Sequence, residues 1–197
     1  MRRLLAGLAA LAVGAAGPPP ADPDWPCVQR LVPTLTAGTI WAGSVAAAGD
    51  WRADPQVAAV VAEAAPRGRP VSGAVARLDA YAATLPAAGR PAALGLVFTG
   101  LVDETNRQRA EVIERLRGIA RRQRSLTEIT DRVTAELRAL PADAPAAVRE
   151  EVVQRRTFLI REYEEIGRTI RYACEVPGAL EARLGSFAQA LQKDLAQ

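Results

Sequence analysis

Apolar side chains recur every seven residues through the middle of this chain, and no other feature of the sequence restricts the fold as strongly. The repeating positions are Phe98, Val112, Ile119, Leu126, Val133 and Leu140. A second set, Val102, Leu116 and Leu137, falls four places after members of the first, and its remaining places are the polar residues Arg109, Gln123 and Thr130. Both sets lie on one side of a helix and form a stripe along which two helices pack. We therefore expect a long helix that begins near residue 91.

A turn and a second amphipathic segment follow this helix. Pro141 and Pro145 enclose an Ala-Asp-Ala sequence, which predicts that the chain reverses at 141–145. The next helix is expected over 146–173, with apolar positions at Val148, Val152, Leu159, Ile166 and Ile170. Facing residues then have numbers that add up to about 286, and the apolar positions obey this rule. The sequence predicts an antiparallel helical hairpin over 91–173, a coiled-coil-like arm, and leaves open whether a capping pattern at 125–128 breaks its first helix.

The same numbering rule brings opposite charges together across the hairpin. It predicts the ion pairs Arg121–Glu165, Arg124–Glu162 and Asp131–Arg155. Half of the residues in 115–124 are arginines, a density that by itself suggests binding to nucleic acid or acidic lipid. Because the facing segment is acidic, we expect an ion-paired helix face and no nucleic-acid partner.

Residues 1–16 have the features of a secretory signal peptide. Arg2 and Arg3 precede an apolar run at 4–13, and the small residues at 14–16 suit a cleavage site. The apolar run is shorter than the roughly 20 residues that cross a bilayer. We therefore expect a periplasmic or secreted protein that has no stable membrane insertion after cleavage, with an uncleaved anchor as the alternative.

The chain has two cysteines, Cys27 and Cys174, which lie near its opposite ends. It has no histidine, so we expect neither a c-type haem site nor a thiolate activated by histidine. The Trp-Pro pair before Cys27 does not fit the cleavage motif of a lipid-anchored protein. Two cysteines in an exported chain usually pair, and we predict a disulfide between them.

The segment between the signal peptide and the first helix, residues 17–53, is rich in proline and glycine and is expected to be irregular. It contains all three tryptophans, Trp25, Trp41 and Trp51. These side chains either pin the segment onto the helices or form a contact patch for a partner or ligand.

Shorter helices are expected on both sides of the hairpin. Asp54 followed by Pro55 is a strong helix start, and the pattern predicts two short helices within 54–90. Another helix is predicted within 174–197. The expected fold is all-α, with a small helical body, a long antiparallel hairpin and an irregular N-terminal segment.

The sequence holds none of the motifs that mark the common catalytic sites. Adjacent carboxylates such as Glu164 and Glu165 point in different directions on a helix, and the histidine that a di-iron bundle needs is missing. We expect no catalytic residue, metal or cofactor. The leading interpretation is an exported, non-catalytic adaptor or chaperone-like protein that binds or organises a protein partner, with homo-oligomerisation left open. A periplasmic helical-bundle carrier of a small apolar ligand is the alternative, and an enzyme of unknown type comes third.

Overall fold

A computed structural model describes residues 22–41 and 49–196, and the chain is all-α in these residues, as the sequence predicts. Its α-helices are α1 (Pro55–Ala64), α2 (Val71–Thr84), α3 (Arg90–Ala139), α4 (Ala146–Ala173) and α5 (Val176–Leu195). Short 3-10 turns at Ala37–Thr39 and Trp51–Ala53 precede α1. The predicted signal peptide lies outside the described residues.

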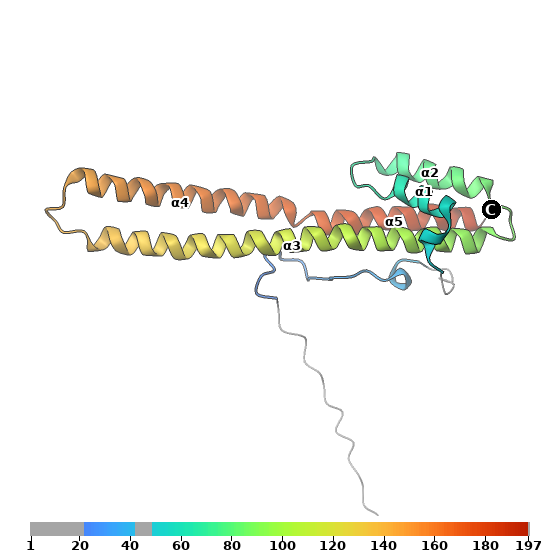
Figure 1. Ribbon diagram of the computed structural model, residues 1–197, viewed down its shortest axis with the longest axis horizontal. Helices are drawn as coiled ribbons and strands as arrows, with labels where there is room; N and C mark the ends of the chain where they lie inside the picture. Colours follow the sequence, from blue (N-terminus) through green and yellow to red (C-terminus); the bar gives the residue numbers. More distant parts are fainter. Residues whose placement is uncertain (1–21, 42–48, 197) are drawn as a thin grey trace, which may run out of the picture.

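Helix α3 runs the full length of the helical part of the molecule, and the other helices pack along it (Figure 1). Its 50 residues extend about 75 Å and continue through the capping pattern at 125–128 without a break. The chain reverses at 140–145, and α4 and then α5 run back along α3 almost end to end. Pro177 lies in the first turn of α5, where a helix tolerates proline, and marks the break between α4 and α5.

The body of the molecule is formed by α1, α2, α5 and the first half of α3 (Figure 1). Asp54 caps α1, because its carboxylate accepts hydrogen bonds from two backbone N–H groups of the first turn. Beyond the other end of α1, the buried guanidinium of Arg183 donates to the carbonyl oxygens of Ala64 and Pro66. The core side chains that are fully shielded from water include Val57, Val61, Leu78, Leu94, Phe98, Leu101, Leu184 and Leu191.

One glycine of α3 sets the distance between α1 and α3. A Cβ atom at Gly100 would lie 2.7 Å from Cγ2 of Val61 and 2.9 Å from Cδ2 of Trp51. These separations are too short for carbon atoms, so Trp51 packs on the backbone of α3 only because residue 100 has no side chain. The indole N–H of Trp51 also donates to the carboxylate of Asp103 at 2.9 Å, which fixes the ring.

Residues 22–35, the N-terminal strap, run along α3 from the middle of this helix back toward the body (Figure 1). Cys27 of the strap and Cys174, at the end of α4, form the predicted disulfide, with sulfur atoms 2.02 Å apart. At the body end of the strap, the side-chain amide of Asn106 accepts from the N–H of Leu35 and donates to its carbonyl oxygen. The strap is therefore fastened to the helices at both of its ends and at Cys27 between them.

Arg109 explains one of the polar interruptions of the repeat. Its guanidinium is buried and donates to the carbonyl oxygens of Val32, in the strap, and Pro177, in α5. A charged side chain therefore occupies a seam position because it joins three segments of the chain where the hairpin meets the body.

The arm comprises the second half of α3 from residue 119, the turn and α4. A single row of buried apolar side chains joins its two helices: Leu126, Val133, Val152, Leu159, Ile166 and Ile170. These are members of the seven-residue repeat and of its counterpart in the second helix. The antiparallel hairpin predicted from the sequence is therefore present, with its turn at the predicted place.

Candidate functional site

Two aromatic side chains of α4 project from the surface of the arm. Phe158 is 66% exposed and Tyr172 is 74% exposed, whereas Phe98 and Phe187 of the body are buried. The two exposed rings are fourteen residues apart, a spacing that brings them to one side of the helix at a distance of about 21 Å. We call this side of α4 the aromatic face.

The seam between α3 and α4 determines where the aromatic face points. Leu159 is buried between the helices, so its neighbour Phe158 is turned about 100° away from the seam. Two ion pairs lie on the same flank, Arg122–Glu162 and Glu136–Arg155. Exposed aromatic rings framed by paired charges are typical anchors of protein interfaces. The arrangement therefore suits contact with another macromolecule.

The ion pairs predicted across the hairpin, Arg121–Glu165, Arg124–Glu162 and Asp131–Arg155, were wrong in their partners. Glu162 pairs with Arg122 at 2.6 Å. Arg155 pairs with Glu136, and Glu165 pairs with Arg168 of its own helix. Arg121 and Arg124 both bind Asp24 of the strap.

The error has a geometric cause. Two residues whose numbers add up to about 286 lie at the same position along the axes of the two helices. The sum does not give the direction in which either side chain points. Measured around α3 from the seam residue Leu126, Arg122 is turned by only about 40°. Arg121 and Arg124 are turned by about 140° and about 160°. Arg122 therefore reaches α4, whereas the other two point away from it and meet the strap.

Two carboxylates of the strap bind three of the five arginines in the arginine-rich segment of α3. Asp22 binds Arg117 at 2.8 Å, and Asp24 binds Arg121 at 2.9 Å as well as Arg124. The N–H of Asp24 and the guanidinium of Arg117 lower the pKa of Asp22. Arg121 and Arg124 lower the pKa of Asp24. The segment is an ion-paired face, as expected, but its main partner is the strap and not α4.

The three tryptophans lie in different surroundings. Trp41 is buried and stacks on Phe98, with ring centroids 4.6 Å apart. Trp51 is buried between α1 and α3. Trp25 is half-buried, and its indole N–H donates to the carbonyl oxygen of Gln29 within the strap. Trp41 and Trp51 thus pin the irregular segment onto the helices, which is one of the two roles that the sequence left open.

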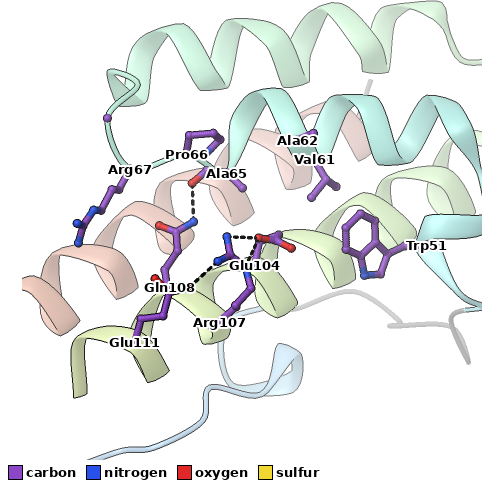
Figure 2. Close-up of a pocket in the computed structure, with 11 residues that line it drawn as sticks. Trp51, Val61, Ala62, Ala65, Pro66, Arg67, Glu104, Arg107, Gln108 and Glu111 are labelled. Carbon is purple, nitrogen blue, oxygen red and sulfur yellow. Dashed lines mark hydrogen bonds and ion pairs between the residues drawn. The ribbon is translucent and has the colours of Figure 1, made fainter. Parts of the chain in front are cut away.

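Trp51 also borders a hollow of about 450 Å³ between α1 and α3 (Figure 2). One wall is formed by apolar side chains of α1, such as Val61. The other wall is formed by α3, where Arg107 pairs with both Glu104 and Glu111. One of the two walls therefore carries charged side chains, whereas a carrier of apolar ligands usually surrounds its ligand with apolar ones.

Phe158, Tyr172 and the two strap carboxylates were not predicted from the sequence. The sequence did carry a signal for the two aromatic residues, because both lie off the seam, whereas the buried apolar residues of α4 follow it. No comparable signal marks Asp22 or Asp24. Their arginine partners lie 95 to 100 residues further along the chain, and the strap has no periodic pattern that fixes its position.

Comparisons with family models, curated proteins and solved structures found no match for this chain. Among the helices that the structure describes, none is both long and apolar enough to cross a membrane. The candidate site is therefore defined by the geometry of this chain alone.

Proposed function

We propose that this protein is an exported, non-catalytic interaction protein that binds a protein partner through the aromatic face of its arm. The observation that supports this function is the exposure of Phe158 and Tyr172 on a projecting pair of helices. Aromatic side chains are enriched among the residues that contribute most to protein interfaces. Their position on the arm leaves the body free to act as a scaffold.

Two features support export of the chain. A disulfide such as Cys27–Cys174 is typical of proteins that fold outside the reducing cytoplasm. Residues 1–16 have the composition of a secretory signal peptide, whose cleavage would release the protein into the periplasm or the medium.

The spacing of the two rings defines the chemistry of the partner surface. To bind both Phe158 and Tyr172, the partner needs two apolar pockets about 21 Å apart on its surface. Between the rings, Glu165 and Thr169 are exposed, so the partner also needs polar groups between its pockets. A folded protein surface provides this alternation of apolar and hydrogen-bonding groups. The carrier alternative has less support, because charged side chains line the hollow beside Trp51.

Photo-cross-linking in the native cells tests this function. A photoreactive phenylalanine analogue in place of Phe158 should join the protein to one partner in good yield. The same analogue in place of Ala76, an exposed residue of α2 in the body, is the control and should not capture that partner. Capture from position 76 and not from position 158 would place the binding surface on the body and contradict the proposal.

Alanine variants provide a second, quantitative test. Phe158→Ala with Tyr172→Ala should remove most partner binding and leave the unfolding midpoint nearly unchanged, because both side chains are exposed. Thr157→Ala changes an exposed neighbour on the same helix and should bind normally. Full binding by the double variant would show that the aromatic face is not the docking surface.

A further inference from the structure

The N-terminal end of the strap covers a row of arginines on α3. Arg117, Arg121 and Arg124 lie within about 60° of one another around the helix, on the side that faces away from the seam with α4. We call this row the arginine stripe. The strap runs along this side of α3, and α4 runs along the other (Figure 1). The arginine stripe and the aromatic face therefore belong to different helices and are separate surfaces.

The segment that covers the arginine stripe is a short turn with two carboxylates. The N–H of Asp24 donates to Oδ1 of Asp22 at 2.9 Å, and the N–H of Trp25 donates to the carbonyl oxygen of Asp22 at 3.1 Å. An aspartate followed by proline commonly starts a turn of this kind. Since both hydrogen bonds lie within four consecutive residues, the local sequence builds the turn without help from α3.

The contacts between this turn and the arginine stripe are of a general kind. The two carboxylates bind all three guanidinium groups of the stripe. Arg124 also donates to the carbonyl oxygen of Pro23 at 3.1 Å, a main-chain contact that every residue type offers. Glu114 of α3 pairs with Arg117 at 3.6 Å and with Arg121 at 3.0 Å. Without the strap, three guanidinium groups and one carboxylate would therefore leave two positive charges on the stripe.

The turn is held to the arginine stripe only weakly. No residue from 22 to 34 is buried, and ion pairs that are open to solvent contribute little to stability. The turn also lies on the N-terminal side of Cys27, outside the loop that the disulfide closes. It can therefore leave the stripe while the disulfide and the core of the body stay intact, and segments with so few buried contacts open most readily.

We propose that the turn at Asp22 and Asp24 masks the arginine stripe, and that an acidic turn of a partner protein binds the stripe by displacing it. The chain's own turn defines the chemistry of this partner. It carries two carboxylates that are two residues apart and a main-chain carbonyl group between them that accepts a hydrogen bond. Paired guanidinium and carboxylate groups form the strong, charge-assisted class of hydrogen bond. This site goes beyond the proposed function, because binding at the aromatic face does not depend on it.

Masking should weaken the binding of such a partner without abolishing it. A tethered turn has an effective concentration in the millimolar range, which a partner must overcome. If the turn occupies the stripe for about nine-tenths of the time, binding from outside is about tenfold weaker, because only the free stripe is competent. Salt screens exposed charges, so the binding should also decline as ionic strength rises.

Fluorescence anisotropy with a labelled peptide, Asp-Pro-Asp-Trp-Pro, tests the masked site, since this peptide copies residues 22–26. The purified, disulfide-bonded wild type should bind the peptide weakly at low ionic strength. The unmasked variant, Asp22→Asn with Asp24→Asn, should bind it about tenfold more tightly. A second peptide, Asp-Trp-Pro-Pro-Asp, has the same composition but separates the two carboxylates. The unmasked variant should bind this second peptide clearly more weakly than the first.

Matched arginine variants show whether the arginine stripe is the binding site. In the unmasked variant, the further changes Arg121→Gln and Arg124→Gln should remove most of the peptide binding. The control changes Arg132→Gln and Arg138→Gln remove the same charge from exposed positions further along α3 and should leave binding nearly unchanged. All four side chains are exposed, so circular dichroism should show the same helical content in every variant.

Three outcomes would overturn the proposal. Equal peptide binding by the wild type and the unmasked variant would show that the turn does not mask the stripe. Equal binding of the two peptides, or equal losses from the two pairs of arginine changes, would reduce the effect to net charge. The third outcome is an unmasked variant that does not bind the peptide. If that variant instead bound vesicles of phosphatidylglycerol, the stripe would be a contact for anionic membranes and not for a protein.

Discussion

The body and the arm are both made of helices, but they exclude water to different degrees. In the body, four helical segments surround a core in which many side chains are completely buried. In the arm, one row of side chains lies between two helices, and its members, such as Leu126 at 9% and Ile166 at 8%, keep a small contact with water. Layered burial therefore stabilises the body, whereas the arm has little more than a single seam.

This difference explains why the disulfide and the polar contacts between distant segments lie close together where the arm begins. The disulfide, the buried Arg109 and the ion pairs of Asp22 and Asp24 all lie near the junction of the arm with the body. Beyond them the arm depends on its own seam. Local opening should begin at the turn and proceed toward the junction, since regions with few buried contacts open first.

Removing the disulfide should have the largest effect on stability. Cys27→Ser with Cys174→Ser removes a disulfide that closes a loop containing most of the chain. We expect a loss of about 2–5 kcal/mol in the free energy of unfolding. Urea unfolding of the variant and of the wild type measures this loss. Hydrogen exchange should show the greatest acceleration in the strap and at the junction. An effect confined to the core of the body would contradict the view that the disulfide mainly fastens the junction.

Two glycines of α3 offer a direct contrast between the core of the body and the junction with the arm. Gly100→Ala forces a methyl group against Val61 and Trp51, and overpacking of this kind costs about 1–3 kcal/mol. At Gly118, where the arm meets the body, the nearest atom to a new Cβ would be 3.8 Å away. Gly118→Ala should therefore stabilise the protein by up to about 1 kcal/mol through helix propensity. Thermal unfolding of both variants tests this contrast, and equal effects would contradict it.

Asp194 in the body should make stability depend on pH. Burial and the nearby carboxylate of Asp79 raise the pKa of Asp194, although Lys193 and Arg90 oppose this shift. A raised pKa means that the folded state holds this proton more tightly than the unfolded chain does. Stability should therefore decline as pH rises through the ordinary aspartate range up to the raised value. Asp194→Asn should remove this decline and raise the unfolding midpoint slightly at neutral pH, whereas an unchanged pH profile would contradict the assignment.

Removing the carboxylates of the strap should have the smallest effect on stability. Their pH dependence has the opposite sign to that of Asp194. The pKa values of Asp22 and Asp24 are lowered in the folded state, so their contribution is present at neutral pH and is lost as pH falls through those lowered values. Asp22→Asn with Asp24→Asn should speed hydrogen exchange in the strap and barely change global unfolding, because the disulfide remains. If exchange in the strap were unaffected, these ion pairs would not fasten it.

Much of the fold could be predicted from the sequence, because it depends on local or periodic patterns. The repeat through Leu126 and Val133 indicates the long helix, and the reversal at 141–145 aligns it with α4. Asp54 and Pro55 mark the start of α1 through the chemistry of a helix cap. In each case, residues that are close in sequence or regularly spaced carry the information.

The features that escaped prediction depend on rotation around a helix or on contacts between distant segments. The predicted partner of Arg121 was wrong because matched residue numbers give the position along the helix axis and leave the direction of the side chain undetermined. The strap follows α3 through contacts such as Asn106 with Leu35, and no pattern in its own sequence reveals that path. Phe158 was not predicted because the seven-residue repeat defines only the seam side of a helix and says nothing of its other sides.

The most direct test of the division between a supporting body and a binding arm is to shorten the arm. Deleting residues 125–139 together with 147–161 removes matched lengths of α3 and α4, including Phe158, and leaves a short turn to rejoin them. Partner capture, circular dichroism and non-reducing peptide mapping should then be compared with the full-length protein. We expect a helical body that still contains the Cys27–Cys174 disulfide, unfolds cooperatively and no longer captures the partner. A folded, shortened protein that captures the partner as well as the full-length chain would contradict this account.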